Sequence, residues 1–284
     1  MQTVMVTGAD GYIGSEFIKR YENNYKFIKA SLSSKKNLNF ESVDVVLHLS
    51  ALVHQKVKLK DEEYFKINTE QTIDLATKAK QFGVKYFIFY STVAVYGKHG
   101  FINRQKEVIN EDSLCEPSNA YGKSKFEAER LLLNLEDGNF KITIIRPPMV
   151  YGKNCPGNMA KLKKLILLSP LLPFNYNDNK RSIVNIDNLT YFTKQVIDNN
   201  VAGILIPQDN DSCSIKQIVT TIAKGSNKKV ILFKFPNFIF NFLCNKKPQM
   251  INSLYGTLIF DSTKSNQKVN YIEKLSAEKA LLLT

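Results

Sequence analysis

The chain has 284 residues, of which 44% are hydrophobic, and a formal net charge of +13. This length can bury the core of one large domain, or of a domain with a small cap. The lysines are spread along the whole chain and are not gathered in a tail or block, which argues against nucleic-acid binding. A small molecule that bears phosphate groups is therefore the expected partner.

The longest apolar runs, residues 162–174 and 233–244, are interrupted by lysines and prolines, so we expect no membrane insertion. Residues 3–6 already have the pattern of a strand and Gly8 follows them, so we expect no signal peptide. The four cysteines stand far apart, without metal-type or redox-type spacing, and the three histidines add no metal cluster. We therefore expect reduced thiols, no metal site and a cytoplasmic location.

The first two-thirds of the chain alternates short β-branched or aromatic runs with helical stretches, which is the pattern of a parallel sheet wrapped by helices. The predicted strands are residues 4–6, 26–28, 43–49, 86–90 and 142–145. The predicted helices are residues 12–21, 62–82 and 121–135. The interval 30–43 is too short for a full strand–helix unit, so we expect a trimmed connection with residues 37–40 as a stub of strand.

After Pro147 the pattern changes to prolines, asparagines and short helical stretches, and only residues 203–206 and 230–233 look like strands. The whole pattern predicts an α/β fold with a Rossmann-type, doubly wound parallel sheet. We expect residues 1–150 to form the dinucleotide-binding domain and to carry the catalytic residues. Residues 151–284 are expected to form a smaller C-terminal substrate-binding cap that is partly interleaved with this core.

A glycine-rich turn, TGADGYIG at residues 7–14, joins the first strand to the first helix. Gly8 permits the tight turn, Gly11 lets the backbone approach a pyrophosphate, and Gly14 lets the helix pack closely on the strand. The helix N-terminus adds free N–H donors and its dipole. The turn therefore predicts dinucleotide contacts from Gly8, Asp10, Gly11, Tyr12, Ile13 and Gly14.

The cofactor type is read about 20 residues further on, where an acidic residue would hold the ribose hydroxyls of NAD. Residues 30–36 are ASLSSKK, which contain hydroxyl and ammonium groups but no carboxylate. Ser31 and Lys35 would suit the 2′-phosphate of NADP, so we favour NADP(H) over NAD(H). The alternative is that these lysines are ordinary surface residues.

Tyr121 and Lys125 open a predicted helix and lie on one face, a turn apart. A tyrosine with its ordinary pKa near 10 is a poor acid or base at neutral pH. We expect the ammonium group of Lys125 to favour the phenolate, lower the pKa of Tyr121 and hold a nicotinamide ribose. Ser91 and Thr92 follow the 86–90 strand, at the end where doubly wound sheets bind ligands. A hydroxyl there would bind a substrate carbonyl beside Tyr121, or would only cap the strand end.

These motifs resemble those of the extended short-chain dehydrogenases, the NAD-dependent epimerase/dehydratase family. The resemblance rests on the glycine turn, on HLSA at residues 48–51, on Asn68, on STVAVYG at residues 91–97 and on Tyr121 with Lys125. It implies a Rossmann domain in which Thr92, Tyr121 and Lys125 have the catalytic roles and Asn68 supports the site geometry. It also implies cofactor contacts from Leu49, Ser50, Ala51, Asn68, Tyr121, Lys125 and Pro148.

Other segments resemble one subgroup, the bacterial reductases of UDP-2-acetamido-2,6-dideoxy-4-hexuloses that serve surface-polysaccharide synthesis. These segments are ALVH at 51–54, IRPPMVYG at 145–152, PGN at 156–158, KRSIVNIDNL at 180–189 and LYGTLIFD at 254–261. The resemblance implies that Asn158 and Arg181 contact the UDP phosphates, and an arginine fork suits a pyrophosphate. His54 either lines the sugar pocket or is a structural histidine. The family also implies a homodimer through two long helices.

Two features depart from the family. The short connection before residue 43 lacks the Asp-containing strand that many relatives use near the adenine, and a second pyrophosphate arginine has no clear match near the C-terminus. These departures affect the expected nucleotide contacts and leave the catalytic motifs unchanged.

The residues after Thr92 narrow the reaction. Sugar-nucleotide 4,6-dehydratases of this class carry Asp-Glu there, whereas this chain has Val93 and Ala94, which cannot exchange protons. The epimerase-reductases that make GDP-fucose use a cysteine at the position of Ala94. Three hypotheses remain: an NADPH-dependent 4-keto reductase, which we favour, a 4-epimerase that retains NAD, and a non-catalytic NADP-binding regulator.

Overall fold

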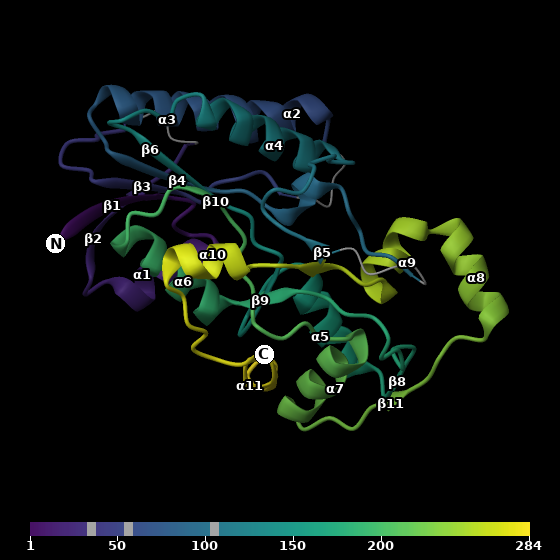
Figure 1. Ribbon diagram of the computed structural model, residues 1–284. Helices are drawn as coiled ribbons and strands as arrows, with labels where there is room; N and C mark the ends of the chain where they lie inside the picture. The colour runs from purple at the N-terminus through teal and green to yellow at the C-terminus, as the bar shows by residue number, and fades with distance from the viewer. Residues whose placement is uncertain (33–37, 54–58, 103–107) are drawn as a thin grey trace.

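The computed structural model describes residues 1–32, 38–53, 59–102 and 108–284. Its centre is a six-stranded sheet with the strand order β10-β6-β4-β3-β1-β2, and every neighbouring pair is parallel (Figure 1). The strands are β1 (Gln2–Thr7), β2 (Tyr25–Ala30), β3 (Val45–His48), β4 (Tyr86–Tyr90), β6 (Lys141–Ile145) and β10 (Gly203–Leu205). The prediction of a Rossmann-type parallel sheet is confirmed.

Helices cover both faces of this sheet, and the alternation of side chains along each strand divides the core between them. Tyr86, Ile88 and Tyr90 of β4 pack on one side, while Phe87 and Phe89 pack on the other. The first side is covered by α1 (Tyr12–Tyr21), α6 (Ile186–Asp198) and α10 (Thr263–Val269) (Figure 1). The second is covered by α2 (Asp61–Phe65), the π-helical turn η1 (Lys66–Glu70), α3 (Gln71–Gln81) and α4 (Ala120–Leu133) (Figure 1).

The described part of the sheet ends at β2, since residues 31–32 and 38–44, the described part of the connection to β3, form no strand. In a full doubly wound sheet a third strand would lie beyond this edge. Residues 38–40, part of the stub expected at 37–40, are not a strand, so that prediction is wrong for them; Asn37 lies outside the described residues. Phe40 is instead buried in a turn, closed by the Val43 N–H donating to the Phe40 carbonyl at 3.1 Å.

The C-terminal part surrounds a second apolar core formed mainly by α5 (Asn158–Leu168), α7 (Ile215–Gly225), α9 (Pro248–Tyr255) and α11 (Ala277–Leu282). Helix α8 (Asn237–Lys246) lies at its outer edge (Figure 1). Short parallel pairs complete it: β7 (Met149–Tyr151) with β9 (Ile183–Asn185), β8 (Leu171–Leu172) with β11 (Ile231–Leu232), and β5 (Val108–Ile109) with β12 (Ile259–Phe260). Strands β5, β7, β8, β9 and β12 were not predicted, because two or three residues are too few to show an alternation.

The chain after residue 150 also returns to the central sheet. It supplies the edge strand β10 and two of the helices on one face, α6 and α10. The first residues after β6 in turn begin the C-terminal part, since β7 starts at Met149. The two parts therefore share segments.

A buried polar group lies at the end of β3, between the sheet and the helices. His48 is fully buried, with Nδ1 at 2.6 Å from Thr7 Oγ1 and Nε2 at 2.9 Å from Thr72 Oγ1. Burial, helped by the nearby charge of Lys125, lowers the pKa of His48 to about 3. His48 is therefore neutral in the folded protein at neutral pH.

This depressed pKa predicts that acid destabilises the fold through His48. The unfolded chain binds the proton below about pH 6.5 and the folded chain only near pH 3, so the free energy of unfolding should fall as the pH drops through this window. Between pH 7 and pH 5 the contribution of His48 is about 2 kcal/mol. Urea unfolding at both pH values should show this loss in the wild type but not in His48→Gln.

The control is His99→Gln, at a half-buried position outside the core. It should keep the wild-type difference between the two pH values. An unchanged difference in His48→Gln would contradict the assignment.

Candidate active site

The parallel strands β1, β3, β4 and β6 end at one edge of the sheet, and a cavity of about 440 Å³ lies there. The predicted site residues that line it are Gly8, Gly11, Tyr12, Ile13, Gly14, Leu49, Ala51, Ser91, Thr92, Tyr121, Lys125 and Pro148. The other lining residues are Val53, Tyr90, Pro147, Val150, Cys155 and Pro156, which sequence reasoning missed. The glycine turn and the Thr92–Tyr121–Lys125 set therefore share one crevice.

The glycine turn has the geometry of a phosphate cradle. Gly8 has φ +67°, and a Cβ there would lie 2.8 Å from the Ser50 nitrogen. A Cβ on Gly14 would lie 2.4 Å from the Gly8 carbonyl oxygen, so the first turn of α1 packs directly on the loop. The N-cap residue Gly11 supplies no capping side chain, and the first turn has no acidic residue. The first N–H groups of α1 are thus available to an anion, which fits a dinucleotide pyrophosphate.

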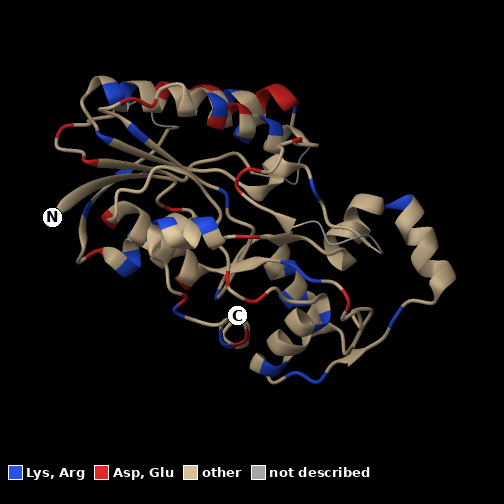
Figure 2. Ribbon diagram, viewed as in Figure 1, with Lys and Arg blue, Asp and Glu red and all other residues tan. Residues whose placement is uncertain are grey.

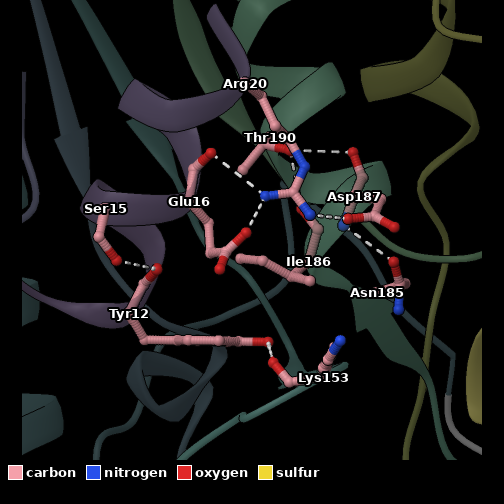
Figure 3. A network of polar contacts seen from close by, with 9 residues as sticks. All are labelled: Tyr12, Ser15, Glu16, Arg20, Lys153, Asn185, Ile186, Asp187 and Thr190. Carbon is pink, nitrogen blue, oxygen red and sulfur yellow. Dashed lines mark hydrogen bonds and ion pairs between the residues drawn. The ribbon is translucent and has the colours of Figure 1, made fainter. Parts of the chain in front are cut away.

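Tyr12 joins this cradle to the C-terminal part of the chain. Its hydroxyl donates to the Lys153 carbonyl at 3.0 Å, just beyond β7 (Figure 3). On the same side, Arg20 of α1 pairs with Glu16 and with Asp187 at the start of α6 (Figure 3). These contacts hold α1 against both α6 and the segment that follows β7.

The side chains predicted to be catalytic meet because α4 begins against the short helix η2 (Val93–Tyr96). A Cβ on Gly122 would lie 2.8 Å from the Ala94 carbonyl oxygen, so only a glycine allows this approach. Thr92 is the N-cap of η2, where its hydroxyl accepts from the Ala94 N–H at 3.1 Å, and it is also hydrogen-bonded to the Tyr121 hydroxyl. The expected pairing of Thr92 with Tyr121 is present.

The electrostatics differ from the expectation that Lys125 lowers the pKa of Tyr121. Burial raises the pKa of Tyr121 to about 12, against a smaller lowering by the hydrogen bond to Thr92. Lys125 is itself buried, with Nζ at 3.9 Å from the centroid of the Phe89 ring. Burial lowers the pKa of Lys125 to about 7, and the charge of Glu129 opposes that shift. At neutral pH, Tyr121 is thus a protonated acid beside a partly protonated amine.

Glu129 fixes this part of α4 through a buried ion pair. It lies four residues beyond Lys125, and its carboxylate accepts from Arg146 Nε at 3.1 Å and from the terminal Arg146 nitrogen at 2.6 Å. Arg146 also donates to the Tyr96 hydroxyl at 2.8 Å. Sequence reasoning did not single out this pair, although Tyr121, Lys125 and Glu129 have the i, i+4, i+8 spacing of one helix face.

Asn68 lies behind the crevice on η1, where it is fully buried. Its amide nitrogen donates to the Leu52 carbonyl at 3.0 Å and to Ser124 Oγ at 3.1 Å, while its oxygen accepts from the Leu52 N–H at 2.7 Å. Ser124 in turn donates to the Tyr121 carbonyl at 2.9 Å. Asn68 therefore ties the loop after β3 to the start of α4, and it does not line the crevice where a cofactor contact was expected.

The remaining predicted residues lie elsewhere. Asp10 is exposed and Ser31 follows β2, and neither lines the crevice; Ser50 donates its N–H to Thr7 Oγ1 at 3.3 Å. Lys35 and His54 lie outside the described residues. Asn158 and Arg181 meet in a second cavity of about 460 Å³ in the C-terminal part.

That second cavity is apolar except for a few groups. Burial lowers the pKa of Arg181 to about 10, and the guanidinium donates to the Gly256 carbonyl at 3.1 Å. Among the residues that the structure describes, no carboxylate forms an ion pair with Arg181. A buried cation without an acidic partner can hold an anion.

The two cavities are neighbours. Pro148 and Val150 line the crevice, whereas Met149, between them, lines the second cavity. Strand β7 therefore forms part of the wall of both. A ligand with a diphosphate near Arg181 and a reacting group near Tyr121 would pass this strand.

Among the described ranges, no helix is long and apolar enough to cross a membrane, and no group of three or more His, Cys, Asp or Glu side chains could hold a metal ion.

Known proteins are similar to this chain in sequence. UDP-glucose 4-epimerase of Vibrio cholerae is 27% identical over 95% of this chain and 90% of its own. The N-acetyl-alpha-D-glucosaminyl-diphospho-ditrans,octacis-undecaprenol 4-epimerase of Escherichia coli O157:H7 is 30% identical over 61% of this chain and 52% of its own.

Solved structures show the same fold. UDP-glucuronic acid 4-epimerase from Bacillus cereus with NAD has a TM-score of 0.76 at 22% identity, covering 99% of this chain and 97% of its own. RMD from Pseudomonas aeruginosa with NADPH has a TM-score of 0.77 at 16% identity, covering 100% of this chain and 97% of its own. Residues 4–203 match the family described as NAD dependent epimerase/dehydratase. Because this match spans well over half of the sequence, the chain belongs to the NAD-dependent epimerase/dehydratase family.

Proposed function

We propose that this enzyme is an NAD(P)H-dependent 4-keto reductase of a UDP-4-keto-6-deoxy-N-acetylhexosamine. The crevice in which Thr92, Tyr121 and Lys125 face the same cavity as the glycine turn supports hydride transfer at a sugar carbon, and the observation that carries the reductase assignment is the absence of a carboxylate at residues 30–36. The turn would hold the dinucleotide pyrophosphate, and the bound nicotinamide would supply the hydride. The subgroup motifs around Arg146 and Arg181 support the substrate class.

Tyr121 is suited to give a proton to the oxygen at the fourth carbon of the sugar. Its raised pKa keeps the hydroxyl protonated at neutral pH, so the proton is available when the ketone oxygen becomes an alkoxide. Thr92 holds the phenol by a hydrogen bond and orients it. Lys125 stabilises the negative charge that develops on Tyr121 as the proton leaves.

The second cavity would bind the UDP portion of the substrate. Arg181 and Asn158 would contact the diphosphate, and the apolar residues around them would pack against the nucleoside. The sugar would then reach past β7 into the crevice. In this arrangement residues 1–150 hold most of the cofactor and the catalytic groups, and residues 151–284 form the substrate cap, partly interleaved with the core.

The region expected to hold the adenine end of the cofactor favours an enzyme that exchanges its dinucleotide over one that retains it. The sheet ends at β2, and the connection to β3 has no carboxylate between Ala30 and Phe40 to hold the adenine ribose of NAD. A reductase must release its oxidised cofactor in every cycle, whereas an epimerase must keep it. The same stretch, with its serines and lysines, supports NADP(H) over NAD(H).

A 4-epimerase is the second candidate. The observation that favours it is the likeness over nearly the whole chain to a UDP-glucose 4-epimerase. An epimerase needs Tyr121 as a base in one half of its cycle, so in that case the bound cofactor would have to lower the pKa of the phenol. A non-catalytic regulator would have no chemical use for the complete catalytic set.

We expect Tyr121→Phe to lower kcat by about 10²–10⁴-fold while leaving cofactor binding largely unchanged, because only the proton donor is lost. Single-turnover rates and a dinucleotide titration would measure both effects. Tyr191→Phe, on α6 outside the crevice, is the matched control and should retain full activity. A Tyr121→Phe enzyme with a near-normal rate would remove Tyr121 from the mechanism.

Arg181→Ala should raise KM for the UDP-sugar much more than it lowers kcat, since Arg181 is remote from the reacting carbon and binds ground state and transition state alike. Arg181→Lys keeps the charge but not the bidentate fork and should have an intermediate KM. Arg130→Ala, an exposed arginine on α4, controls for the loss of surface charge. If KM were unchanged in Arg181→Ala of normal thermal stability, the diphosphate assignment would be wrong.

The reductase and the epimerase are separated by the cofactor that the protein carries. Purified protein should contain little dinucleotide, be stabilised more by NADPH than by NADH, and oxidise NADPH stoichiometrically with the UDP-4-keto-6-deoxy-N-acetylhexosamine. It should not interconvert UDP-GlcNAc and UDP-GalNAc. Tightly bound NAD, together with that interconversion in the absence of added cofactor, would establish the epimerase instead.

A further inference from the structure

Helix α8 presents aromatic side chains to the outside of the molecule. Phe238 is 75% exposed and Phe242 is 59% exposed, and their i, i+4 spacing places them on one side of the helix. The other side packs inward, because Phe240, Leu243 and Cys244 contact the apolar core of the C-terminal part. A surface helix of a globular protein normally has polar residues on its outer side. Helix α8 has apolar side chains on both its outer and its inner side.

The stretch around α8 is strongly basic. Residues 212–260 contain seven lysines and no Asp or Glu, so they supply more than half of the net charge of +13. Lys234 precedes α8, Lys246 is its last residue, and Lys247 follows it; all three are exposed. In Figure 2, α7, α8 and the segment between them show basic residues without acidic ones. The exposed phenylalanines thus lie between lysines at both ends of α8.

Further apolar side chains are exposed in the same part of the molecule. Leu171 of β8 and Ile231 of β11 are 54% and 69% exposed, and they are register partners in their two-stranded sheet. Leu168, the last residue of α5, is 72% exposed. The C-terminal part therefore combines exposed apolar side chains with an excess of positive charge over several elements.

We propose that α8 binds the surface of an anionic lipid bilayer, with Phe238 and Phe242 entering the interface and Lys234, Lys246 and Lys247 contacting the lipid phosphates. Aromatic side chains beside lysines on an amphipathic helix are the chemistry that such an interface recognises. A second copy of this chain fits less well, because a symmetric contact would bring the same acid-free stretch against itself. A polyanion such as nucleic acid would satisfy the lysines but not the two phenylalanines.

Binding to lipid vesicles tests the proposal without reference to catalysis. The full-length protein should float with vesicles of phosphatidylglycerol mixed with phosphatidylcholine, and much less with pure phosphatidylcholine. Phe238→Ser/Phe242→Ser should weaken partitioning by about tenfold for each phenylalanine. Lys246→Gln/Lys247→Gln should weaken it by about 30-fold in low salt, at about fivefold for each lysine.

Matched controls lie outside this surface. Phe82→Ser removes a phenylalanine that is also mostly exposed, at the end of α3, and Lys26→Gln/Lys29→Gln removes two exposed lysines from β2. Both variants should bind the vesicles like the wild type, and all variants should keep the wild-type melting temperature and activity in solution.

Several outcomes would overturn the proposal. One is the absence of binding to the phosphatidylglycerol vesicles by wild-type protein. Another is binding that the phenylalanine variants leave unchanged and that salt abolishes, which would show charge attraction alone. A third is a sedimentation experiment in which the wild type is a dimer and Phe238→Ser/Phe242→Ser is a monomer. The exposed side of α8 would then be a contact between copies of this chain.

Discussion

The buried pair between Arg146 and Glu129 is the interaction on which the geometry of the crevice depends. Arg146 follows β6, the strand next to β4, and Glu129 lies on α4, so the pair ties α4 to the end of the sheet where the crevice lies. Both side chains are almost wholly removed from water, and the Tyr96 hydroxyl takes up a further donor of the guanidinium. Removing one partner of such a pair leaves a buried charge uncompensated, at a cost of about 3–5 kcal/mol. The pair therefore holds α4 in one position relative to β6.

The position of α4 in turn sets the chemistry of Tyr121 and Lys125. Glu129 lies one turn beyond Lys125, and its charge is what opposes the loss of the Lys125 proton on burial. At the start of α4, the close approach of Gly122 to the Ala94 carbonyl places Tyr121 where it can hydrogen-bond to Thr92. A second chain of buried polar contacts, from Thr7 through His48 and Thr72 to Asn68, reaches the same helix from the end of β1. Buried hydrogen bonds thus connect the glycine turn and α4.

Much of this could be predicted from the sequence, since its signals are local. The glycine turn sits between a strand and a helix, and the strands of the sheet are long enough to show their patterns, so α1 and β4 have the predicted bounds. The pKa values could not be predicted, because burial of Tyr121 and Lys125 depends on packing between distant segments. The second cavity was also hidden. Its walls come from α5, α7 and α9, from β7 and from the segments around Phe174 and Arg181, and no single stretch of sequence shows that these elements meet.

The chain resembles both 4-epimerases and an NADPH-bound structure because these proteins all have the same fold. A hydroxyl, a tyrosine and a lysine beside a dinucleotide can move hydride in either direction, so the crevice by itself does not separate reductase from epimerase. The distinction has to come from features outside the catalytic set. In this chain the feature lies on the cofactor side, where residues 30–36 contain no carboxylate to hold the adenine ribose of NAD and the described part of the sheet stops at β2. Among the described residues no strand lies beyond β2, which leaves less contact area for the adenine side of the cofactor and takes none from the substrate. Such a loss is tolerable in an enzyme that exchanges its dinucleotide in each cycle, whereas it would work against one that must keep it.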